Sequence, residues 1–172
     1  MIHVPESAVV EGLPALQSTG RPIVWVHADS LSPLDPALAA NPGAPALFVF
    51  DDVVLEGYEI SLKRVQFIYE CLLDLPIVIR RGGVPGEVVA FAHEHGADHV
   101  VSTWTPAPRF SHLRGLIQQT LPVEIVEQTP FAVLEREPSL GRFSSFWKLA
   151  QKDAFRASHL PRIETPKLPG FS

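Results

Sequence analysis

The sequence has few of the residues that build disulfides, basic surfaces or membrane spans. It contains one cysteine, Cys71, which excludes an intramolecular disulfide and, inside an apolar helical pattern, is typical of a buried thiol. Lysine and arginine number 14 against 19 acidic residues, so the chain offers no net positive field for binding nucleic acid on its own. No apolar run reaches the ~18 residues of a membrane span, and residues 1–20 do not resemble a signal peptide. These absences predict a soluble, cytoplasmic protein with no membrane partner.

What the chain does have is a globular composition and an excess of proline. Hydrophobic residues make up 46% of its 172 residues, which is enough for one ordinary domain with a single core. Seventeen prolines are more than average usage would supply, and many stand at element boundaries or near the chain ends. These prolines mark the ends of short secondary-structure elements.

Five short apolar runs, each bounded by turn residues, predict β-strands. Their apolar residues are continuous instead of alternating, which is typical of strands buried on both faces of a parallel sheet. They are Ile23–Val26, Ala46–Phe50, Ile77–Arg80, His99–Ser102 and Val123–Val126.

Helical spacing separates these strands, and a short crossover lies around Asp35 to Ala40. The apolar positions with steps of three and four are Leu62, Val65, Ile68, Tyr69, Leu72 and Leu73, then Val88, Phe91 and Ala92, then Phe110, Leu113, Ile117 and Leu121. Strands that alternate with helices predict an α/β fold, a three-layer, doubly wound, Rossmann-like sheet of five parallel strands in the order 3-2-1-4-5.

The predicted domain organisation has three parts. Residues 1–21 form an N-terminal extension, and residues 22–135 form the α/β domain. Residues 136–172 hold a helix around Phe143 to Ala150 and a Pro-rich, linker-like tail.

Ligands of an open parallel sheet bind outside the carboxyl ends of its strands, where the strand order reverses. The candidate crevice therefore lies between the loop after the first strand, His27 to Leu34, and the loop after the fourth, Thr103 to Arg109. The candidate ligand-binding residues are Trp25, His27, Asp29, Ser30, Leu31, Asp35, Asp51, Thr103, Trp104, Thr105 and Arg109.

Several of these candidates also have a purely structural interpretation. Asp29 and Asp35 would order the loop, with Asp35 capping the next helix and Pro36 at its first position. Trp25 and Trp104 end the first and fourth strands, where they would act as stacking platforms for a flat ring or as core residues at the sheet edge. The sequence is compatible with both interpretations.

A weaker candidate is a phosphate-binding nest formed by Arg81, Gly82 and Gly83 ahead of a helix. The same glycines also suit a tight strand-to-helix connection, so the motif is not specific. His93 and His95 lie on different faces of a helix without a further ligand at zinc spacing, and no G-x-S-x-G motif occurs, so neither a metal site nor a catalytic residue is predicted.

Four segments follow one another in an order that is typical of a known family. "IVWVHADSLSPLDPAL" combines a strand with an Asp-containing loop through Trp25, Asp29 and Pro36-Ala37-Leu38. "SLKRVQFIYECLLDL" is similar to an Arg-x-x-Phe-Leu-x-Glu-Ser-Leu helix, "RRGGVPGEVVAFAHEHGADHVVSTW" continues as strand, turn, helix and strand, and "GRFSSFWK" is similar to a segment that enters an interdomain linker. Through these segments, residues 22–150 resemble the N-terminal α/β domain of the DNA photolyase and cryptochrome family.

The resemblance implies a site for a light-harvesting antenna chromophore, of flavin, deazaflavin or folate type, or a site that has lost it. The family's loop arginines are replaced by His27, Ala28 and Leu31, and the acid expected after the fourth strand by Thr105. No segment of these 172 residues resembles the helical domain that binds FAD in this family. We therefore expect a free-standing antenna-type domain without photolyase catalysis.

Two functions follow as hypotheses. The first is a non-catalytic module that binds such a chromophore or docks on a separately encoded FAD-binding helical partner. The alternative is a small nucleotide-binding enzyme or sensor of the Rossmann-like, universal-stress type. The aromatic residues Phe143, Phe146 and Trp147 either fold back on the domain or form the interface of a homodimer or partner complex.

Overall fold

The computed structural model describes residues 20–57, 60–128, 130, 132, 134 and 141–155. It divides into two compact units, residues 1–128 and 129–172, which are treated separately below. The predicted domain boundary after residue 135 and most of the N-terminal extension lie outside the described residues. The first unit contains the five strands of the predicted α/β domain.

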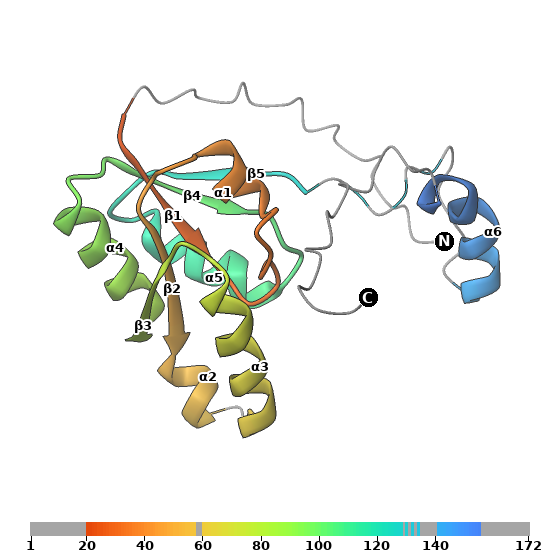
Figure 1. Ribbon diagram of the computed structural model, residues 1–172, viewed down its shortest axis with the longest axis horizontal. Coiled ribbons are helices and arrows are strands. Elements are labelled where there is room, and N and C mark those ends of the chain that lie inside the picture. The colour runs from red at the N-terminus through yellow and green to blue at the C-terminus, as the bar shows by residue number, and fades with distance from the viewer. Residues whose placement is uncertain are drawn as a thin grey trace, which may run out of the picture. The chain divides into compact units, whose positions relative to one another are not determined.

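The first unit is built on a five-stranded parallel sheet (Figure 1). The strands run in the order β3-β2-β1-β4-β5, and every neighbouring pair is parallel, which confirms the predicted fold class. Their bounds are β1 Pro22–Val26, β2 Ala46–Asp51, β3 Val78–Gly82, β4 His99–Thr103 and β5 Val123–Val126. The order reverses between β1 and β4, so the loops after these two strands leave the sheet at its switch point.

Two apolar layers cover the two faces of the sheet, which explains the continuous apolar strands. On one face, Val24 and Phe48 pack with residues of α1 (Pro36–Ala40) and α3 (Leu62–Leu73). On the other face, Trp25 and Leu47 pack with α4 (Val84–Glu94) and α5 (Pro108–Ile117). Alternate residues of one strand therefore enter opposite cores, and both must be apolar.

A further helix, α2 (Asp52–Gly57), follows β2 directly and was not predicted. It has six residues, so it completes fewer than two turns and shows no helical period of its own. Its apolar residues Val53, Val54 and Leu55 are consecutive, so they show no spacing of three or four residues.

Helix α3 buries less of its apolar surface than its pattern predicted. Ile68 and Leu72 are buried, whereas the exposed fractions of Leu62, Tyr69 and Leu73 are 80%, 48% and 62%. Cys71, which the pattern predicted to be buried, is partly exposed. The helix rests on the sheet along one stripe only, so the apolar residues a quarter-turn away remain at the surface.

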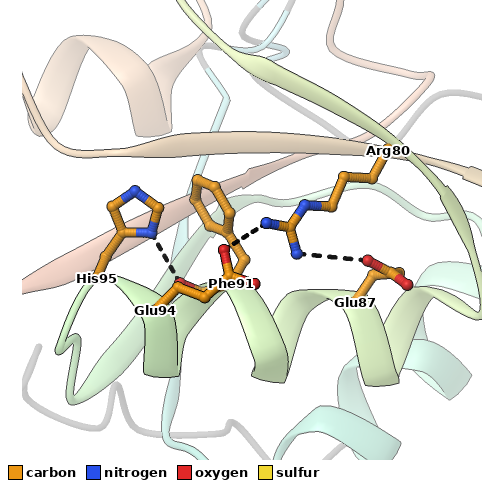
Figure 2. A network of polar contacts seen from close by, with 5 residues as sticks. All are labelled: Arg80, Glu87, Phe91, Glu94 and His95. Carbon is orange, nitrogen blue, oxygen red and sulfur yellow. Dashed lines mark hydrogen bonds and ion pairs between the residues drawn. The ribbon is translucent and has the colours of Figure 1, made fainter.

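On the opposite side, Arg80 links β3 to α4 (Figure 2). Its guanidinium donates to Glu87 at 3.5 Å and to Glu94 at 2.5 Å, and it lies 5.1 Å from the centre of the Phe91 ring. The hydrogen bond with Glu94 raises the pKa of Arg80 and, reciprocally, lowers the pKa of Glu94. This network fixes the helix to an edge strand of the sheet.

The second unit contains helix α6, Phe143–Ala154, which confirms the helix predicted around Phe143 to Ala150. The rings of Phe143 and Trp147 stack at 5.9 Å, and Phe146 lies 6.1 Å from Phe143. Phe143 is 72% exposed. The interface role of these aromatic residues stays a prediction.

Within the described ranges, no helix combines the length and apolar character needed to cross a bilayer.

Candidate functional site

A cavity of about 620 Å³ opens at the carboxyl ends of β1 and β2. Its volume lies within the range of small-molecule sites, roughly 300 to 1,000 Å³. The chain segments around it are the start of the loop after β1, the end of β2, α2, the first half of α3 and the start of α5. The lining residues are Trp25, Val26, His27, Ala28, Asp29, Phe48, Val49, Phe50, Asp51, Val54, Leu55, Ile60, Ser61, Arg64, Ile68, Val84, Ala107, Arg109, Phe110 and Leu113.

The inner wall of the cavity is aromatic. The rings of Trp25 and Phe110 are stacked, with centroids 5.2 Å apart and planes 15° from parallel. His27 lies 5.0 Å from the same phenylalanine ring. Trp25 is only 3% exposed and belongs to the core cluster beneath α5, so it is both a core residue and part of the cavity wall.

An ion pair joins two walls of the cavity. Arg109, from the first turn of α5, donates from Nε to Asp51 Oδ2 at 2.9 Å, and its Nη2 contacts the same oxygen. Asp51 ends β2, and its Oδ1 accepts from the Val53 backbone N–H at 3.0 Å, in the first turn of α2. One carboxylate therefore connects β2, α2 and α5 around the opening.

The loop after β1 contributes a polar side to the cavity. The Nδ1 atom of His27 accepts from the Asp29 backbone N–H at 3.3 Å, and Nε2 lies 2.8 Å from the Thr103 carbonyl oxygen, to which it donates. Asp29 Oδ2 accepts from the buried hydroxyl of Thr105 at 3.0 Å. The loops after β1 and β4 are thus tied together beside the cavity.

Asp35 lies behind this loop, in a buried cluster of hydrogen bonds. It caps α1, as predicted, because Oδ1 accepts from the Leu38 backbone N–H at 2.9 Å. Its Oδ2 accepts from Thr103 Oγ1 at 2.8 Å and from the hydroxyl of Ser30. Thr103 Oγ1 in turn accepts from the Ala37 backbone N–H at 3.1 Å. Asp35, Ser30 and Thr103 hold the backbone and do not line the cavity.

Of the predicted chromophore-binding residues, the cavity brings together five and leaves the others outside its lining. Those that line it are Trp25, His27, Asp29, Asp51 and Arg109; those that do not are Ser30, Leu31, Asp35, Thr103, Trp104 and Thr105. Leu31 packs against the core cluster below α3, and Trp104 is 41% exposed. Binding by any of these residues stays a prediction.

The glycine-rich turn after β3 lies apart from the cavity lining. Arg81 forms ion pairs with Asp52 at 2.7 Å and Glu56 at 2.8 Å, and the hydrogen bond with Asp52 raises its pKa. Gly82 adopts φ = +155°, and a Cβ there would come within 2.9 Å of Glu87 Oε1, which explains a glycine at this position. Gly83 is the N-cap of α4. Carboxylates therefore already lie beside both Arg81 and Gly82. The phosphate-binding role of this turn stays a prediction.

The sequence reasoning missed the residues that complete the cavity from α3 and α5. Phe110 and Leu113 were recognised only as helix positions, and Arg64 only as part of a motif. The available signal was position in the sequence, because Arg64 lies in the first turn of a helix and Phe110 directly follows Arg109. Nothing in the sequence indicated that Phe50 or Ile60 would line a cavity.

No group of three or more His, Cys, Asp or Glu residues suited to a metal ion occurs within the described part of the chain.

Comparisons with known proteins give no family for this chain. No protein-family model matches it, and no curated protein matches it. Among solved structures it is similar to the hypothetical protein MJ0577, with 14% sequence identity and a TM-score of 0.36, over 64% of this chain and 97% of that one. So distant a likeness says nothing of function, and the fold assignment rests on the parallel sheet and its strand order.

Proposed function

We propose that this protein is a small-molecule-binding module whose cavity holds a nucleotide-like ligand, meaning a flat ring system joined to an anionic group. The observation that carries the proposal is the cavity itself. It combines an aromatic and aliphatic interior with two arginines, at the end of the sheet where ligands of parallel α/β folds bind.

The apolar interior suits the ring system. Phe50 and Ile60 line the cavity from the side of β2 and α3, while Phe110 and Leu113 line it from α5. A planar ligand between such walls gains dispersion and desolvation energy without needing specific hydrogen bonds. This would favour a base or a flavin-type ring over a sugar.

Arg64 suits the anionic group. It lies in the first turn of α3, is exposed, and forms no ion pair with any described residue. Arg109 is already paired with Asp51, so an incoming anion would have to compete for it. We therefore assign the first contact with a phosphate or carboxylate to Arg64.

The proposed role is binding and not catalysis. Both ring nitrogens of His27 are engaged by the backbone, and the carboxylate of Asp51 by Arg109 and Val53. Groups held in this way maintain the shape of the cavity, whereas an acid–base catalyst needs contact with a reacting atom.

A light-harvesting chromophore is the second candidate, supported by one specific observation. Trp25 and Asp29, which carry the resemblance to the photolyase and cryptochrome family, both line the cavity. A flavin nucleotide would satisfy both candidates. Docking on a separately encoded FAD-binding partner belongs to this second candidate and stays a prediction.

The test has two arms. An absorption spectrum of protein purified from its own host distinguishes the candidates, because a flavin, deazaflavin or folate gives a near-ultraviolet or blue band and an adenine nucleotide does not. Calorimetric titration with FMN against riboflavin, and with AMP against adenosine, then measures the contribution of the phosphate.

We expect Arg64→Gln to weaken the phosphorylated ligand about five- to fiftyfold, the effect of removing one charge-assisted contact, and to leave the unphosphorylated form unchanged. Lys63→Gln, one residue away and outside the lining, is the matched control. If none of these ligands binds and the host-purified protein carries no extractable small molecule, the proposal is wrong.

A further inference from the structure

The outer flank of α3 carries an apolar stripe that the domain itself leaves uncovered. Leu62, Gln66, Tyr69 and Leu73 recur at steps of four, three and four residues, so they lie within about 60° of one another around the helix. Leu62, Tyr69 and Leu73 are 80%, 48% and 62% exposed. This spacing is that of a coiled-coil seam, and we call these four residues the α3 seam.

The α3 seam is separate from both the core and the cavity. Ile68 and Leu72, which pack on the sheet, lie roughly a quarter-turn away from it around the helix. Arg64, which lines the cavity, lies on the opposite flank. A protein docked on the seam would therefore leave the ligand site open.

From this arrangement we infer that the α3 seam is a homodimer interface, in which the α3 helices of two copies pack antiparallel. Antiparallel pairing about a two-fold axis places Leu62 opposite the partner's Leu73, and Gln66 opposite the partner's Tyr69. The same patch serves both copies, as a two-fold interface requires. The seam is complementary to itself.

The charged residues beside the seam indicate that its partner is a second copy of this chain. Lys63 and Glu70 flank the seam on the side away from the sheet, and both are exposed. In a coiled coil with this seam they occupy equivalent flanking positions, which face one another across an antiparallel pair. Lys63 of each copy then meets the partner's Glu70, giving two opposite-charge contacts. Gln66 Nε2 already donates to Glu70 Oε1 at 2.9 Å, which positions that carboxylate beside the seam.

A parallel dimer lacks this complementarity. In a parallel pair Glu70 faces Val65, which is apolar, and the position that would face Lys63 precedes the helix. The charges therefore select the antiparallel arrangement.

The predicted dimer is weak. Helix α3 has 12 residues, so the seam is about three turns long, and its contact area falls short of the roughly 1,200 Å² of a stable interface. We expect association at roughly tens to hundreds of micromolar. Sedimentation velocity from about 10 µM to 1 mM covers this range.

Charge reversal provides the sharpest test. Lys63→Glu alone and Glu70→Lys alone each replace two attractive contacts by two repulsive ones, so each variant is expected to dimerise at least about tenfold more weakly. An equimolar mixture of the two variants pairs opposite charges again and is expected to restore dimers. The double variant Lys63→Glu with Glu70→Lys restores the homodimer by the same logic.

Two further variants distinguish a specific interface at the α3 seam from nonspecific hydrophobic association. Leu73→Gln is expected to dissociate the dimer. Phe67→Ser is the matched control, because Phe67 is 62% exposed on the same helix but lies off the seam, and it is expected to change nothing. Circular dichroism confirms that each variant is folded, and all four substituted positions are exposed.

The inference is overturned if the wild type stays monomeric at about 1 mM. It is also overturned if a dimer forms that tolerates either single charge reversal, is not recovered by mixing the two reversed variants, or is lost equally with Phe67→Ser.

Discussion

Two carboxylates of this protein have different kinds of partner: Asp35, beneath the loop after β1, and Glu94, on the outer face of α4. Asp35 is 2% exposed and has no cationic partner within the described part of the chain; it accepts hydrogen bonds from a backbone N–H and two hydroxyls. Glu94 is half exposed and meets the guanidinium of Arg80. A buried carboxylate without hydrogen-bond donors lowers the free energy of unfolding by several kcal/mol. Water screens an exposed ion pair, which therefore contributes little to stability. The first region should therefore matter far more for stability than the second.

The largest expected effect comes from removing the buried carboxylate. Asp35→Ala leaves the Leu38 N–H and the Ser30 and Thr103 hydroxyls without their acceptor, and removes the cap of α1. We expect a loss of about 3 kcal/mol in the free energy of unfolding, measured by urea denaturation.

The exposed Asp74, which follows α3, provides the control for that measurement. Asp74→Ala should cost less than about 0.5 kcal/mol. A loss below about 1 kcal/mol for Asp35→Ala would show that the buried cluster is not a stabilising unit.

The ion pair at the cavity should fall between the two extremes. Asp51 is 9% exposed and Arg109 32%, so the pair is screened on one side only. A double-mutant cycle with Asp51→Asn and Arg109→Gln should give a coupling free energy of about 1 kcal/mol that decreases with added salt. A coupling free energy near zero at low salt would show that this pair stabilises the protein no more than the exposed contact between Arg80 and Glu94 does.

The smallest effect is expected on the outer face of α4, and pH is the way to measure it. The hydrogen bond with Arg80 lowers the pKa of Glu94 in the folded protein below its ordinary value. The stability from this contact is therefore present above the unfolded pKa, about 4.3, and is lost as the pH falls through the lower folded value.

An NMR titration should find the Glu94 pKa below the ordinary value, and Arg80→Gln should raise it toward that value. Glu94→Gln should slightly flatten the dependence of stability on pH below about pH 5. An unshifted Glu94 pKa in the wild type would contradict the contact.

The strands were predictable because burial on both faces leaves a strong and local signal. All five strands and the helices α3, α4 and α5 lie where the apolar runs and spacings predicted, with ends that differ by a few residues. The short α2 was missed because its six residues are too few to show a helical period. The cap of α1 by Asp35 was predicted from an Asp-Pro pair, a signal that lies within two adjacent residues.

The candidate site was predictable only in part, because it depends on which segments meet in space. Trp25, His27 and Asp29 leave the sheet at its switch point, and the switch point follows from the order of the strands. Arg64 and Phe110 reach the same cavity from helices that are far apart in the chain, on opposite faces of the sheet. Trp104 ends a strand just as Trp25 does, yet it lies outside the cavity lining.

By itself the sequence determined the sheet, its parallel character and the capped loop after β1, because those features depend on the hydropathy and turn chemistry of neighbouring residues. Only the tertiary structure decided which wall of the cavity each helix supplies, that Asp51 pairs with Arg109, and that α3 buries one apolar stripe while leaving another at the surface. A helical pattern states how many residues are apolar, whereas the crossing of the helix over the sheet decides which of them find a partner.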